Sequence, residues 1–217
     1  MQGRLKILRY FIIGGIFLTP FIPLFVLGAF FFPYITGKNF VFRIIVEILF
    51  GLWLCLAIFD KNYRPKKSFI LTTAMAFMGI LVISTFLGKN PYRSFWSNFE
   101  RMEGLVGYLH LFAYFIVLAS IMKGQRVWDW FFHILLFVSV IISFYGFSQL
   151  HCQKIYEANE KFSGTVVELQ KTSPFCYSDK GAKNYEVSQG GVRLDAKFGN
   201  ASYLAIYMVF NIFLAAF

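Results

Sequence analysis

The residues best suited to chemistry lie between Ser94 and Gly104, in a short segment that separates two long apolar runs. This segment contains Glu100, Arg101 and Glu103 among aromatic residues. A connector between membrane helices needs only a few polar residues, so a charged, aromatic connector indicates a structure that lies against the membrane edge. The chemistry that such a segment offers is the binding of an anion by its arginine.

A second segment, from Gly190 to Ala205, has the residue types of a tight turn that leads into a helix. It contains Arg193, followed by Gly199 and Asn200. Asn200 is a suitable N-cap, and the helix that it opens would present free N–H groups and a positive dipole end. With Arg193 beside it, this is a second place suited to phosphate. A solvated loop with an ordinary helix cap explains the same residue types and stays open.

A third group of charges lies inside an apolar run, at residues 40–59. Arg43 and Glu47 are four residues apart and therefore share one helix face. Charged side chains inside a membrane helix mark a functional site by default. The alternative is a self-neutralising pair that extends to the membrane interface. Asp129 and His133 have the same spacing but lie beside a turn, at the start of a helix, where we expect interfacial packing.

The composition shows what must position these residues. Of the 217 residues, 58% are hydrophobic and only 15% are charged, whereas about 25% are charged in soluble domains. The aromatic content of 21% is that of lipid-facing and interfacial helices. The net charge of +10 has an ordinary explanation in the basic flanks of membrane helices. Nucleic-acid binding is not expected, because no soluble basic domain is present.

Hydropathy predicts an all-α polytopic membrane protein with one transmembrane domain, residues 1–217, and six transmembrane helices. Pro20 and Pro23 predict a kink or bend in the first helix. A long extracytoplasmic loop, residues 151–199, separates the last two helices. The expected helices are residues 10–32, 40–59, 68–87, 105–122, 127–150 and 200–217.

The distribution of lysine and arginine predicts a cytoplasmic N-terminus. Three such residues precede the first helix, four follow the second and two follow the fourth, and these faces alternate correctly. The opposite face also carries basic residues, which the positive-inside rule does not predict there; they are Lys89, Arg93 and Arg101. An anionic ligand at the outer membrane edge is the simplest reason to keep them there.

The cysteines and histidines give a disulfide prediction and no metal prediction. Cys152 and Cys176 both lie in the long loop, which faces an oxidising compartment in this orientation, so we expect them to form a disulfide worth about 3 kcal/mol. Cys55 is expected to be a small buried apolar residue. No metal site or other cofactor is expected, because the histidines are far apart and the cysteines lack zinc spacing; the histidines are His110, His133 and His151.

Three motifs, in order and spacing, resemble the N-terminal half of the O-antigen ligase and polymerase family. They are residues 32–40 with Arg43 and Glu47, residues 94–104, and residues 193–196 with Phe198, Gly199 and Asn200. The resemblance implies a metal-independent membrane glycosyltransferase of the bacterial inner membrane that serves lipopolysaccharide and cell-envelope biosynthesis. Its partners would be the lipid bilayer and a glycan linked to undecaprenyl pyrophosphate, which is transferred at the periplasmic face to a lipid, protein or glycan acceptor.

The resemblance also implies roles for individual residues. Arg101 and Arg193 would contact the pyrophosphate, followed by Arg43, because planar guanidinium groups match phosphate geometry. The carboxylates would orient these arginines rather than abstract protons; they are Glu47, Glu100 and Glu103. Where the family has Asn-Pro-Asn, this chain has Asn200-Ala201-Ser202, which predicts a looser turn.

The family continues beyond the point that corresponds to Phe217, through more helices and a later periplasmic loop with a catalytic histidine. The resemblance therefore implies a truncated part of a larger helical glycosyltransferase. We expect donor binding to be retained and turnover to require the missing half.

Two other interpretations fit the composition. A transporter or channel subunit would have inverted repeats and broken helices with polar groups near the midplane. No repeat relates the first three helices to the last three, although Pro20 and Pro23 favour this alternative. A fragment that only inserts into the membrane fits equally well.

Overall fold

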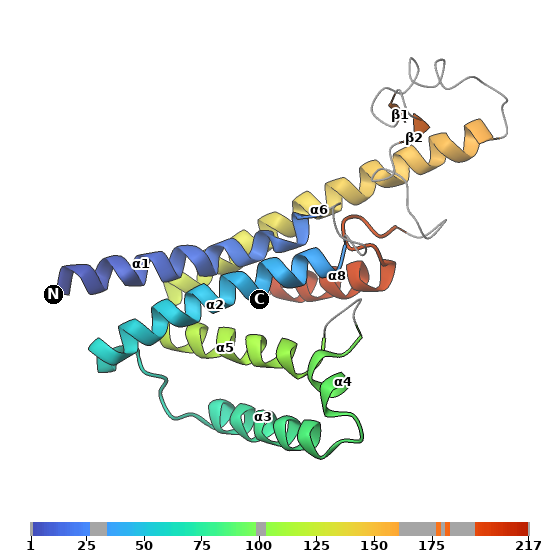
Figure 1. Ribbon diagram of the computed structural model, residues 1–217. Coiled ribbons are helices and arrows are strands. Elements are labelled where there is room, and N and C mark those ends of the chain that lie inside the picture. Colours follow the sequence, from blue (N-terminus) through green and yellow to red (C-terminus); the bar gives the residue numbers. More distant parts are fainter. Residues whose placement is uncertain are drawn as a thin grey trace. The chain divides into compact units, whose positions relative to one another are not determined.

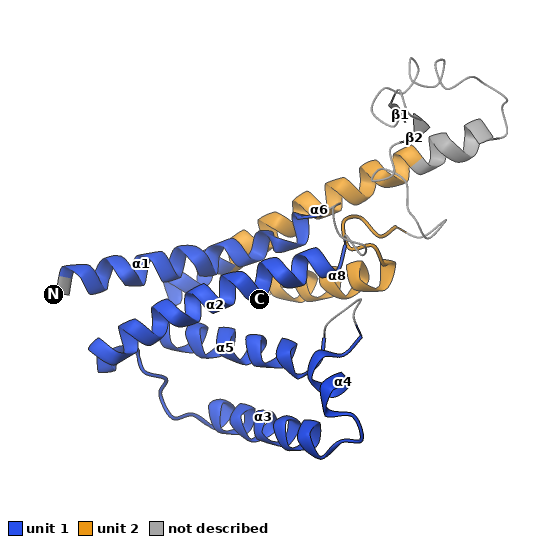
Figure 2. Cartoon of the chain, viewed as in Figure 1, with its two compact units in different colours: residues 1–131 blue, residues 132–217 orange. Residues whose placement is uncertain are grey.

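The computed structural model describes residues 2–26, 34–98, 103–160, 177–178, 181–182 and 194–216. These residues are almost entirely helical. The chain divides into two compact units, Met1–Phe131 and Phe132–Phe217 (Figure 2).

The first unit is a set of apolar helices arranged around α2. Helix α2 packs against both α1 and α5, and α3 packs on α5 (Figure 1). Tyr114 of α5 links these helices, because its hydroxyl lies 2.6 Å from the hydroxyl of Thr19 and its ring meets Phe42 edge-on at 5.6 Å. The elements are α1 (Gln2–Leu18), η1 (Thr19–Leu24), α2 (Thr36–Phe59), η2 (Lys61–Tyr63), α3 (Phe69–Leu87), α4 (Pro91–Trp96), α5 (Leu105–Ile121) and the start of α6 (Gln125–Glu160).

The first helix changes its type at the two prolines. Helix α1 ends at Leu18 and continues as the 3₁₀ helix η1, which has Pro20 in its first turn and Pro23 in its interior. Proline has no backbone N–H and therefore cannot donate the hydrogen bond that would continue an α-helix. The helix begins at Gln2 rather than near residue 10, so the basic N-terminal residues belong to it.

The start of α2 sets the depth of its charges. The helix begins at Thr36, four residues before the predicted start. At 1.5 Å per residue, Arg43 lies about 10 Å and Glu47 about 17 Å along the helix. Glu47 is the twelfth of its 24 residues, so this carboxylate lies near the middle of the helix.

Helix α4 lies between α3 and α5 and is not among the predicted elements. Asn90 caps it by accepting a hydrogen bond from the backbone N–H of Arg93 at 3.2 Å, and Pro91 fills the first helical position. Ser97 ends it with a φ of 63°. Gly104 then opens α5, which places Glu103 directly before that helix.

The second unit contains most of α6 and α8 (Ala201–Ala216), with a small antiparallel pair, β1 (Tyr177–Ser178) and β2 (Gly181–Ala182). Helix α6 continues to Glu160, ten residues beyond the predicted end. The expected loop therefore begins later than residue 151. The hydroxyl of Ser143 on α6 contacts the sulfur of Met208 on α8 at 3.6 Å.

Large apolar side chains cover the outside of these helices. Among the described residues, four helical segments are long and apolar enough to cross a membrane: Gly3–Leu24, Thr36–Phe59, Phe69–Leu87 and Gln125–Cys152. Phe69 is 87% and Ile58 69% exposed, an arrangement that is stable in lipid and unfavourable in water. Helices α5 and α8 are apolar but have only 17 and 16 residues, about 25 Å against the roughly 30 Å of a bilayer core. The chain is thus a helical membrane protein, and the number of six spans stays a prediction.

Candidate functional site

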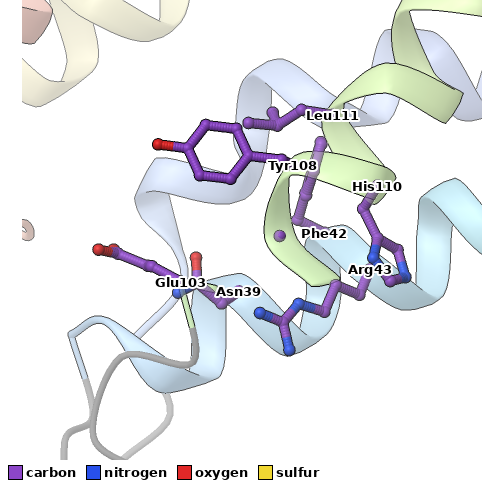
Figure 3. Close-up of a pocket in the computed structure, with 8 residues that line it drawn as sticks. Asn39, Phe42, Arg43, Glu103, Tyr108, His110 and Leu111 are labelled. Carbon is purple, nitrogen blue, oxygen red and sulfur yellow. The ribbon is translucent and has the colours of Figure 1, made fainter. Parts of the chain in front are cut away.

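Arg43 is a buried charge inside an apolar helix. Its residue is only 9% exposed, and its guanidinium lies beside the first turns of α5 (Figure 3). Glu47 and Glu103 both interact electrostatically with it. A buried intramembrane arginine costs several kcal/mol to insert and is retained where it has a function or a partner. Arg43 therefore interacts with two other predicted site residues, Glu47 of the same helix and Glu103, which the sequence had grouped with Arg101 rather than with Arg43.

A cavity of about 290 Å³ lies between the first half of α2 and the first turns of α5. Its size is at the lower end of the roughly 300–1,000 Å³ of small-molecule sites, so it suits a polar headgroup rather than a whole glycan. The charged groups beside it are Arg43 and Glu103 (Figure 3). The lining residues are Asn39, Phe42, Arg43, Glu103, Gly107, Tyr108, His110 and Leu111.

His110 connects Glu47 to this cavity. Its Nε2 lies 3.0 Å from Oε1 of Glu47, and its Nδ1 lies 2.7 Å from the carbonyl oxygen of Val106. A carbonyl oxygen only accepts, so Nδ1 carries a proton and donates it. The 3.0 Å contact then needs a second proton, which lies on either Nε2 or the carboxyl group. In both cases the His110–Glu47 pair is neutral overall.

This neutrality explains how Glu47 is tolerated in the middle of α2. Its side chain is 66% exposed, whereas that of His110 is 15% exposed. A lone carboxylate at that depth would be costly, but a neutral pair with His110 reduces the cost. The sequence-based alternative was a self-neutralising pair of Arg43 and Glu47. In the structure Glu47 also contacts His110 of another helix.

Four of the predicted residues cannot be placed. Arg101, Glu100, Arg193 and Cys176 lie outside the described residues. The expected meeting of Arg101 and Arg193 at one anion therefore stays a prediction.

The predicted cap at Asn200 is present in the second unit. Its side-chain oxygen accepts a hydrogen bond from the backbone N–H of Ser202 at 2.8 Å, and its carbonyl accepts from Leu204 at 3.2 Å. Gly199 has a φ of 67°, a conformation that favours glycine. These contacts fix the entry of the chain into α8.

Gln149 of α6 holds the segment that precedes this cap. Its side-chain nitrogen donates to Oδ1 of Asp195 at 2.7 Å, and its side-chain oxygen accepts from the backbone N–H of Ala196 at 2.9 Å. Gln149 and Asp195 are 1% and 4% exposed. One amide therefore satisfies a buried carboxylate and a buried backbone group, and it fixes the segment directly after Arg193.

Gln149→Leu is expected to destabilise the protein by about 2–4 kcal/mol, because it takes away the amide that both buried groups contact. The matched control is Gln125→Leu on the same helix, where an exposed amide donates to Asp129 at 3.0 Å and is worth only about 0.5 kcal/mol. The free energy of unfolding in detergent measures both variants. Equal stability of the two would show that the Gln149 contacts are not important.

The cysteines agree only in part with the predictions. Cys152 is fully buried and disulfide-bonded, while the predicted partner Cys176 lies outside the described residues. Cys55 was predicted to be buried, and this is wrong, because it is free and exposed on α2. Its position faces away from the packed side of that helix.

Sequence reasoning did not select His110 or Gln149 as functional residues. His110 is a single ionisable residue in a long apolar run, and that isolation is the signal that was available. Gln149 lies at the polar end of its run, between Ser148 and His151, and has no such signal. Within the ranges that the structure describes, no group of three or more His, Cys, Asp or Glu side chains is placed to hold a metal ion.

The fold and this site define a class: a helical membrane protein with a charged cluster inside its helices. No protein family, no curated protein and no solved structure matches the chain. The function must therefore be argued from the cluster itself.

Proposed function

We propose that this protein binds a glycan linked to undecaprenyl pyrophosphate and takes part in its transfer to a lipid, protein or glycan acceptor, as O-antigen ligases do. The reaction would occur at the periplasmic face of the bacterial inner membrane. In this proposal the chain has six spans and a cytoplasmic N-terminus, and the start of α5 lies at the outer edge.

The observation that carries the proposal is the buried Arg43 beside a cavity between α2 and α5. The charge is attached about 10 Å along a membrane helix, and the long arginine side chain can extend towards a lipid pyrophosphate near the helix end. Arginine suits this ligand because its planar fork can donate two hydrogen bonds to phosphate oxygens. The cavity volume of about 290 Å³ agrees with a headgroup whose glycan and lipid chain extend outside it.

The chemistry requires little covalent participation from the protein. An acceptor hydroxyl oxygen attacks the anomeric carbon of the glycan, and the bond from that carbon to the pyrophosphate oxygen breaks. The leaving pyrophosphate keeps the electron pair, and the hydroxyl proton passes to a base. Negative charge grows on the bridging oxygen, so Arg43 would stabilise the transition state more than the ground state. Glu47 and Glu103 would orient Arg43.

The proposal is tested by ligand binding in nanodiscs with two matched probes, undecaprenyl pyrophosphate and undecaprenol. The two share the lipid chain and differ in the anion. The protein is expected to bind the pyrophosphate at least about tenfold more tightly, as one bidentate charged contact predicts. Equal affinity for the two probes would contradict the proposal.

A membrane transporter or channel subunit is the alternative, favoured by the break of the first helix at Pro20 and Pro23. Reconstituted vesicles separate the two functions. A transferase consumes its glycan-linked carrier and moves no solute, whereas a transporter moves labelled solute and leaves the carrier lipid unchanged. Solute flux without carrier consumption would indicate a transporter and contradict the proposed glycan transfer.

A further inference from the structure

The first unit has a second concentration of charge, at the end where α2 and α5 terminate. Three basic side chains, Arg9, Lys66 and Lys123, lie close enough to interact electrostatically. They come from α1, from the segment between η2 and α3, and from the turn between α5 and α6. Charges from three separate segments therefore meet at one place, far along α2 from Arg43.

Tyr63 is the centre of this basic cluster. The ammonium group of Lys123 lies 4.8 Å from the centre of its ring, and the guanidinium carbon of Arg9 lies 5.9 Å from it. Both are cation–π distances. The backbone of Tyr63 is held in place from α2, because Nε1 of Trp53 donates a hydrogen bond to its carbonyl oxygen at 3.0 Å. The cluster thus has a fixed aromatic base with a cation on each of two other segments.

The positive charges of the cluster are incompletely compensated. Nε of Arg9 is buried and, in the part of the chain that the structure describes, has no hydrogen-bond partner. Partial burial lowers the pKa of Lys123, and repulsion from Lys66 and Arg9 lowers it further, while Asp60 acts in the opposite direction. Lys123 also donates a hydrogen bond to the backbone carbonyl of Asn62. Among the described residues, Lys123 thus interacts with two other cations and with the carboxylate of Asp60, and a bound anion would relieve the repulsion between the cations.

We propose that Arg9, Lys66, Lys123 and Tyr63 form a binding site for the phosphate group of an anionic phospholipid. The cluster lies where two apolar helices, α2 and α5, end at Phe59 and Ile121. Lipid phosphates lie at the level where membrane helices end. An arginine beside an aromatic ring offers both a hydrogen-bond donor to phosphate and a surface for the lipid glycerol. The site is independent of the proposed glycan transfer, because it lies at the other end of α2.

The site is tested by native mass spectrometry and thermal unfolding in nanodiscs of phosphatidylcholine, with and without phosphatidylglycerol. The unmodified protein is expected to retain one phosphatidylglycerol and to unfold at a higher temperature when that lipid is present. The double variant Arg9→Gln/Lys123→Gln is expected to lose the preference for phosphatidylglycerol by on the order of tenfold.

The matched control is Arg4→Gln/Lys6→Gln, which removes the same net charge from exposed positions of α1. It is expected to keep the preference. An equal loss in both double variants would overturn the proposal, since it would show only general attraction of basic residues to an anionic surface. If the first double variant does not fold, the single variant Lys66→Gln, at an exposed position, makes the same comparison against Lys6→Gln.

A separate arm distinguishes lipid from free phosphate. Inorganic phosphate is added to the protein in detergent without phospholipid, and the unfolding temperature is measured. Little stabilisation is expected, because the lipid's glycerol and chains are missing. If inorganic phosphate stabilises the protein as much as phosphatidylglycerol does, the site binds free phosphate and the proposed lipid occupant is wrong.

Discussion

Arg43→Gln is expected to reduce glycan transfer by on the order of a hundredfold and the preference for undecaprenyl pyrophosphate over undecaprenol by on the order of tenfold. The variant keeps a polar side chain of similar length but loses the charge and the forked donors that match phosphate. The loss should appear in the maximal rate more than in the apparent affinity for the glycan, because charge on the leaving pyrophosphate grows towards the transition state.

Insertion of this variant into the membrane should not suffer. Replacement of a charged by a neutral side chain within a span removes an insertion cost of about 2.5–3.5 kcal/mol. Glu47 keeps its contact with His110, so the replacement leaves that carboxylate paired. A loss of activity therefore reports on the site and not on folding.

Two controls sharpen the result. Arg43→Lys keeps the charge and removes the fork, so an intermediate activity is expected if geometry matters beyond charge. Arg126→Gln removes the same charge from an exposed position at the start of α6 and should leave transfer unchanged. Full activity of Arg43→Gln would refute the role given to this cavity.

Gly104→Ala is expected to destabilise the first unit by about 3 kcal/mol. A Cβ atom at this position would lie 2.3 Å from the carbonyl oxygen of Phe95, 2.6 Å from its carbon and 2.7 Å from the carbonyl oxygen of Ser94. All three are backbone atoms, which cannot rotate away. The corner between α4 and α5 would have to open, and Glu103 would move with it.

The matched control is Gly79→Ala in α3, where a Cβ would meet nothing within 4 Å. Because alanine favours a helix over glycine by about 1 kcal/mol, this variant should be as stable as the unmodified protein or more so. The free energy of unfolding in detergent is the measurement for both. If the two alanine variants have similar stability, the close backbone approach at Gly104 is not a constraint in solution.

The sequence alone predicted the helices well where apolar runs were long. Residues 68–87 correspond to α3 almost without error, because Ser68 caps that helix and no charge interrupts it. The predicted helix 127–150 ends ten residues before α6 does, because the polar residues after residue 150 are typical of a loop. Helix α4 was missed, although Asn90 followed by Pro91 is an N-cap with proline at the first helical position.

Part of the candidate site, the charged residues of α2, was predictable from the apolar run that contains them. Arg43 and Glu47 stand out because a charge in an apolar run is expensive, and the cost is visible in the sequence itself. His110 did not stand out as their partner, because it is separated from Glu47 by 63 residues. A pairing across that separation depends on how α5 packs against α2.

What the sequence by itself determined is therefore that this is a helical membrane protein with charges inside one helix. Composition and spacing are local properties, and they fix where helices form and which face carries a charge. Only the tertiary structure decided that Glu47 pairs with His110, that Arg43 borders a cavity with Glu103, and that Arg9 and Lys123 both lie over the ring of Tyr63. These are contacts between helices distant in the sequence, and side-chain packing rather than hydropathy selects them.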